Sequence, residues 1–73
     1  MNNIEMIDVR SSTIRSIGYD YVEEILVVEF KNRSIYEYYN VSEMIFQNFL
    51  DARSKGTYLG KHIRDKYKYK RIK

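Results

Sequence analysis

The sequence predicts an α+β fold: a three-stranded antiparallel meander with one main helix packed on one face and a short C-terminal helix. Runs of β-branched and aromatic residues between positions 12 and 40 are separated by short polar segments, as in a meander. Apolar residues between positions 42 and 54 recur at the spacings of three and four that are typical of a helix. The chain has 73 residues, which is enough for one small domain with one core.

The first two strands are predicted over 12–20 and 25–30. The first carries Ile14, Ile17 and Tyr19, and Gly18 inside it indicates either a bulge or a close approach of another backbone. The second strand is the clearest, because it is rich in β-branched and aromatic residues. Residues 21–24 form the turn between them, where the adjacent carboxylates of Glu23 and Glu24 favour solvent.

A hairpin turn over 31–34 leads into a third strand over 35–40, which is dense in tyrosine. In this turn Asn32 tolerates a positive φ, whereas Arg33 adopts one only at an energetic cost. Because the connections between the strands are short, neighbouring strands are expected to be antiparallel.

The main helix is predicted over 42–54, with Ser42 as its N-cap and Gly56 as its C-terminal stop. Glu43 suits the positive end of the helix dipole. Thr57 is expected to cap a second, shorter helix, inside which Gly60 costs about 1 kcal/mol relative to alanine. The apolar stripe of the main helix consists of Ile45, Phe46, Phe49 and Leu50.

Alternation along the strands predicts which face of the sheet is buried. Since an unpaired carboxylate is costly to bury, the faces that carry Glu29 and Glu37 are expected to point outward. The inner face then holds Leu26, Val28, Phe30, Tyr36 and Tyr38, packed beneath the stripe of the main helix. The outer face holds Ile25, Val27, Ile35 and Tyr39, which form either a surface for a protein partner or a homodimer, or a face covered by residues 1–10.

Charge is distributed unevenly along the chain. Residues 1–60 carry 6 Lys/Arg and 9 Asp/Glu, a net charge of −3, whereas residues 61–73 carry 7 Lys/Arg and one acid, a net charge of +6. A basic run of this kind attracts polyanions, although it also serves simply as a solvated terminus. We expect an N-terminal arm over 1–10, a folded domain over 11–67 and a basic C-terminal tail over 68–73.

A set of residues spread in order along the chain forms a recognisable pattern: Ser11, Ser12, Ile14, Ile17, Gly18, Tyr19, Asp20, Leu26, Val28, Phe30, Tyr36, Tyr38, Ala52, Ser54, Gly56, Tyr58 and Ile63. Taken together, these residues resemble the KTSC domain, a family of small domains named for the C-terminal extension of certain lysyl-tRNA synthetases and also found as free-standing bacterial and phage proteins. The resemblance covers Val9 to Tyr67 and implies RNA binding. The chain departs from it at Asn32-Arg33, where glycine is usual, at Val41-Ser42, where Val-Pro is usual, and at Gly60, where asparagine is common.

The residues give no catalytic pattern. The chain has no cysteine and no glycine-rich phosphate loop, and its one imidazole, His62, lies among Lys61, Arg64 and Lys66. Glu29 and Glu37 are able to face each other across strands, but two carboxylates alone make a weak cation site. We therefore expect a small basic protein that is not an enzyme and that holds no cofactor or metal.

Two functions remain open, and the basic segment favours RNA or another nucleic acid as the partner. Its cations would contact phosphates while Tyr67 or Tyr69 stacks on a base, and the residues concerned are Lys61, Arg64, Lys66, Tyr67, Lys68, Tyr69, Lys70, Arg71 and Lys73. The alternative is a protein-interaction module, phage-encoded and acting on a host protein, that uses the outer face. Attachment to a membrane surface ranks last, because the basic segment has few apolar anchors. We expect a soluble, cytoplasmic protein with no membrane partner.

Overall fold

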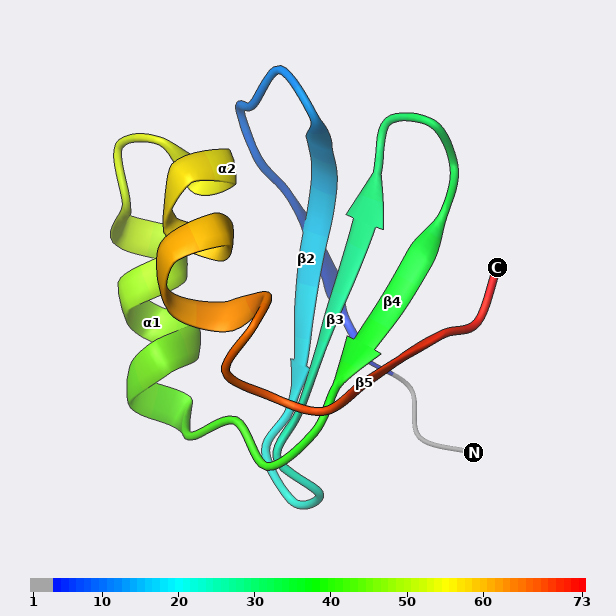
Figure 1. Ribbon diagram of the computed structural model, residues 1–73, viewed down its shortest axis with the longest axis vertical. Helices are drawn as coiled ribbons and strands as arrows, with labels where there is room; N and C mark the ends of the chain where they lie inside the picture. Colours follow the sequence, from blue (N-terminus) through cyan, green and yellow to red (C-terminus); the bar gives the residue numbers. More distant parts are fainter. Residues whose placement is uncertain (1–3) are drawn as a thin grey trace.

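A computed structural model describes residues 4–73, which form one five-stranded antiparallel sheet with the helices gathered on one of its faces (Figure 1). The strands follow the chain order across the sheet. Their bounds are β1 (Met6–Asp8), β2 (Ile14–Asp20), β3 (Ile25–Phe30), β4 (Ile35–Tyr38) and β5 (Tyr69–Arg71). The helical elements are α1 (Glu43–Asp51), α2 (Lys55–Tyr58) and the π-helical turn η1 (Leu59–Ile63).

The central three strands confirm the predicted meander, but the prediction of only three strands is wrong. The N-terminal arm supplies β1 and the basic tail supplies β5, so that each end of the chain forms an edge of the sheet (Figure 1). Both edge strands have three residues, all with exposed side chains. Backbone pairing alone defines such strands, and they carry no buried apolar pattern for the sequence to reveal.

The inner face of the sheet and the stripe of α1 form the core, as predicted. Leu26 and Val28 are fully buried, Tyr38 is 3% exposed, and they pack with Phe46 and Phe49 of α1. A bulge between Ile14 and Ser16 lets Ile14 and Ile17 both point inward, because it inserts one extra residue into β2. The remaining core residues are Tyr19, Val41, Leu59 and Ile63.

The helices begin and end differently from the prediction. Ser42 caps α1, as expected, and its side chain accepts a hydrogen bond from the Ile45 backbone N–H. However, α1 ends at Asp51, and Gly56 lies inside α2 instead of stopping α1. The cap of α2 is Ser54, whose Oγ accepts from the Thr57 N–H at 3.3 Å. The main helix was predicted to continue to residue 54, but it ends earlier because the Ser54 side chain caps α2.

In the β3–β4 turn, the positive φ of 74° falls on Arg33 rather than on Asn32. Asn32 contributes its side chain instead, because its Oδ1 accepts from the Ser34 N–H at 3.0 Å and from the Ser34 hydroxyl at 2.6 Å. The turn is therefore held by an asparagine side chain while the neighbouring arginine adopts the strained conformation.

Of the two alternatives predicted at Gly18, the structure shows the close backbone approach, while the bulge of β2 lies between Ile14 and Ser16. A Cβ there would lie 2.5 Å from Met6 Sδ, 2.6 Å from Ile4 Cγ2 and 3.0 Å from the Glu5 carbonyl oxygen. The N-terminal arm thus lies against the outer face of the sheet at Gly18, which pairs with Val27 of β3.

We predict that Gly18→Ala lowers the free energy of unfolding by about 1–3 kcal/mol, because the added methyl overpacks the contact between β1 and β2. Gly60→Ala is the matched control, since a Cβ at Gly60 would meet nothing within 4 Å. That control is expected to raise the stability by about 0.5–1 kcal/mol through helix propensity. Urea denaturation of both variants tests the contrast, and equal effects of the two substitutions would contradict it.

Candidate functional site

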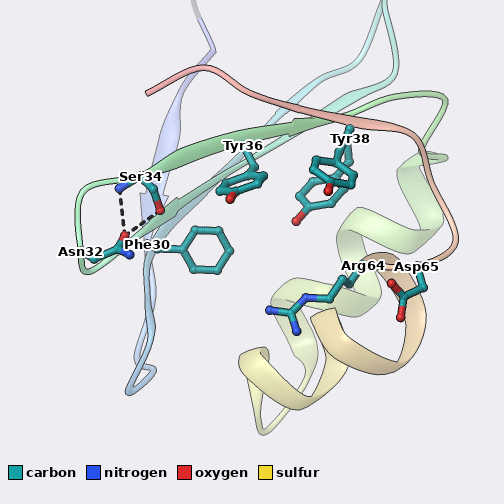
Figure 2. A pocket seen from close by; sticks show the side chains of 8 residues that line it. Phe30, Asn32, Ser34, Tyr36, Tyr38, Arg64 and Asp65 are labelled. Atoms are coloured by element: carbon teal, nitrogen blue, oxygen red, sulfur yellow. Dashed lines mark hydrogen bonds between the residues drawn. The ribbon is translucent and has the colours of Figure 1, made fainter.

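A groove separates the edge of the sheet near β4 and β5 from the end of the helical layer (Figure 2). It has two lobes, which share Phe30, Asn32 and Arg64. The first, here called the aromatic lobe, has a volume of about 410 Å³ and is completed by Ser34, Tyr36, Tyr38, Asp65 and Tyr69. The second, the loop lobe, has about 440 Å³ and is completed by Ser12, Thr13, Lys31, Gly56 and Leu59.

Strand alternation aims the aromatic side chains into this groove. Tyr36 pairs with Val28 and Tyr38 with Leu26, so both tyrosines share the inner face with these core residues. Tyr69 pairs with Tyr38 across the β4–β5 ladder and therefore lies on the same face. Tyr38 is buried, Tyr36 is half-buried and Tyr69 is 57% exposed, so the aromatic surface runs from the core to the solvent.

The rings in the aromatic lobe contact one another. The centroids of Tyr36 and Tyr69 are 5.7 Å apart, and those of Tyr38 and Tyr69 are 5.8 Å apart, both pairs being tilted by 39°. Phe30 meets Tyr36 edge-on, with centroids 5.6 Å apart. Such contacts hold each ring in place, which gives the lobe a preformed aromatic wall.

Arg64 and Asp65 directly follow η1, and Figure 2 shows the Arg64 side chain extending into the space below the rings, with Asp65 farther away on the helical segment. Burial raises the pKa of the Tyr38 hydroxyl, and the positive charge of Arg64 offsets part of this rise. The lobe thus combines an aromatic wall with one cation and one carboxylate.

The structure distributes the predicted nucleic-acid residues over several environments. Arg64 and Tyr69 line the groove. Arg71 pairs with Tyr36 and so shares the groove face of the sheet, whereas Lys70 pairs with Glu37 on the outer face. Tyr67 packs against the core. The side chains of Lys61, Lys66, Lys68 and Lys73 are exposed.

Sequence reasoning did not place Phe30, Asn32, Ser34, Tyr36 or Asp65 in a site. Alternation assigned Phe30 and Tyr36 to the core, and both do pack partly against it. The available signal was their position at one end of the inner face, whereas Leu26 and Tyr38 lie in the buried part of that face.

The predicted protein-interface residues lie on the outer face as expected, but they are partly covered. Val27 is 7% exposed, and Ile25, Ile35 and Tyr39 are half-buried. The Tyr39 hydroxyl donates a hydrogen bond to Glu37 Oε1 at 2.8 Å, which raises the pKa of Tyr39.

Glu29 and Glu37, which the sequence allowed to face each other across strands, do not do so. Glu29 pairs with Ile35, and Glu37 pairs with Val27, so the two carboxylates are diagonal neighbours. Glu29 instead accepts a hydrogen bond from the Ser16 hydroxyl at 2.8 Å. Within residues 4–73 no group of three or more His, Asp or Glu side chains is placed to hold a metal ion. Nor do these residues form a helix of the length and apolarity that a membrane crossing requires.

Comparison with known proteins confirms the resemblance. The family model of the KTSC domain matches residues 10–67. The crystal structure of a KTSC domain protein from Yersinia pestis superposes with a TM-score of 0.93 at 35% identity, covering 97% of this chain and 100% of that chain.

Two kinds of sequence relatives are found. A protein of Stutzerimonas stutzeri is 34% identical over 70 residues, covering 94% of this chain and 99% of its own length. A lysine–tRNA ligase of Nostoc punctiforme is 31% identical over 61 residues, covering 84% of this chain. The chain spans only 11% of the length of that ligase, so the likeness concerns one segment of the larger enzyme.

We predict that stability falls at high pH and that Tyr38 contributes to the fall. Burial raises the pKa of Tyr38 above its ordinary value of 10.0, so the folded protein holds this proton more tightly than the unfolded chain. The contribution is therefore complete below pH 10.0 and is lost as the pH rises through the higher folded value. Urea denaturation of Tyr38→Phe should show a smaller loss above pH 10.0 than the parent protein, and identical pH profiles would refute this assignment.

Proposed function

This chain belongs to the KTSC domain family, and we propose that it is a non-catalytic module that binds RNA through its basic C-terminal segment, residues 61–73. The observation that carries the proposal is that part of this segment forms β5 (Tyr69–Arg71) at the edge of the sheet, which holds cations on the same strand as the exposed ring of Tyr69. Cations supply affinity for phosphates, and an exposed ring supplies a stacking surface for bases.

The structure of β5 supports this role over that of a solvated terminus. The Tyr39 N–H donates to the Lys68 carbonyl at 2.9 Å, and the Ile35 N–H donates to the Lys73 carbonyl at 3.0 Å. The backbone is therefore held while Lys68, Lys70 and Lys73 keep their side chains in solvent. Cations on a held backbone bind a polyanion with a smaller loss of chain entropy than cations on a free tail.

The relatives favour RNA as the polyanion. Part of a lysine–tRNA ligase resembles this chain, and an enzyme so named handles tRNA. A segment that adds affinity for RNA would be useful to such an enzyme. We extend this reasoning to the present chain, whose basic segment carries a net charge of +6.

We predict that replacing Lys68, Lys70 and Lys73 together with glutamine weakens the binding of labelled single-stranded RNA and of tRNA. The slope of log affinity against log salt should become shallower by about 2, because each lost phosphate contact on a single strand removes about 0.7. Fluorescence anisotropy over a salt series measures both quantities.

The matched control removes three charges elsewhere, through Arg10→Gln, Arg15→Gln and Arg53→Gln, all at exposed positions. It is expected to retain most of the affinity and nearly the parent slope. The proposal is wrong if the parent protein binds neither the single-stranded RNA nor the tRNA at low salt. It is also wrong if the triple lysine variant and the triple arginine control behave alike.

A further inference from the structure

We infer that the aromatic lobe receives one unpaired base of the bound RNA, so that the protein prefers single-stranded to double-stranded RNA. This inference rests on the proposed RNA binding and adds the class of RNA that the site selects.

The shape of the lobe excludes bases that remain in a duplex. The rings of Tyr36 and Tyr38 project from the sheet into the space between the strands and the helical segment (Figure 2). Tyr36 is half-buried and Tyr38 is 3% exposed, so neither ring forms a flat outer platform. Bases inside a duplex are stacked and paired, and only a base that leaves the stack reaches rings inside a groove.

The exposed ring of Tyr69 marks the entrance. It contacts both Tyr36 and Tyr38, with centroid distances of 5.7 and 5.8 Å, and it is the most exposed of the three. A base that stacks on Tyr69 therefore continues onto an aromatic wall that is already assembled, which reduces the entropy cost of binding. The volume of about 410 Å³ lies in the range of pockets that hold small organic ligands.

The charges separate the base from the phosphates. Arg64 and Asp65 both line the lobe, so its lining carries one positive and one negative side chain. A phosphate placed there would be repelled by Asp65, whereas the amino group of a base would find a hydrogen-bond acceptor. The unbalanced cations lie outside the lobe on β5, where Arg71 shares the groove face with Tyr36. This arrangement directs the RNA base into the lobe and the sugar–phosphate backbone of the RNA toward β5.

We predict that the protein binds a single-stranded RNA more tightly than a duplex of the same sequence and length at the same salt concentration. Tyr69→Leu should weaken single-strand binding by about 5- to 100-fold, as expected for the loss of a stacked base, and should leave duplex binding nearly unchanged. Tyr69→Phe keeps the ring and should bind as the parent does. Fluorescence anisotropy measures each affinity.

Tyr21→Leu is the matched control, because Tyr21 is 58% exposed, nearly the same as Tyr69, and contacts Tyr19 and Phe46 away from the groove. It should not change either affinity. Thermal unfolding checks that each variant is folded. For any variant that does not fold, NMR of the parent protein replaces it: the ring signals of Phe30 and Tyr36 should shift with single-stranded RNA and stay unchanged with the duplex.

The outcomes separate the two proposals. If single-stranded and duplex RNA bind equally and in a salt-dependent way, the basic segment binds RNA and base insertion is wrong. If Tyr69→Leu and Tyr21→Leu have equal effects on single-strand binding, insertion at the aromatic lobe is also wrong. If neither RNA binds at low salt, the proposed function itself fails.

Discussion

The pairing of β5 with β4 is the constraint on which the rest of the candidate site depends. A run of lysines has no tendency of its own to lie on a sheet, but the backbone of β4 offers unpaired N–H and C=O groups at the edge. Because side chains alternate along a strand, this register directs Tyr69 to the groove and Lys70 to the outer face opposite Glu37. A shift of one residue would exchange these positions and remove the entrance ring from the groove.

The inner face of the sheet contributes to both the core and the groove because the helical layer covers it unevenly. Beneath α1 the face is closed, and Tyr38 is buried with Leu26 and Phe49. Toward Phe30 and Tyr36 the cover comes from α2, η1 and the residues that follow, and a groove remains. One stripe of aromatic residues therefore changes from core to groove lining along its length, without any change in residue type.

Charge adds a second division to this geometry. The net charge of −3 on residues 1–60 and of +6 on residues 61–73 would attract each other in an open chain. In the fold, the basic segment crosses back to the sheet, and Lys70 comes opposite Glu37, while Arg71 faces the groove. The proposed RNA site lies where the cationic segment meets the aromatic surface, because neither property alone supplies both affinity and contact with bases.

By itself the sequence determined the α+β class, the central hairpins and the buried face, because these depend on local periodicity. At Gly18 it left a bulge and a close backbone approach open, and the tertiary structure decided for the approach. The KTSC resemblance was also readable from residues in order. The sequence did not reveal β1, β5 or the groove. Edge strands of three exposed residues are defined by their backbone partners on other strands. Phe30, Arg64 and Tyr69 come together around the groove only in the folded chain. Tertiary structure alone decided these features, since pairing register and the reach of the helical layer are properties of the assembled backbone.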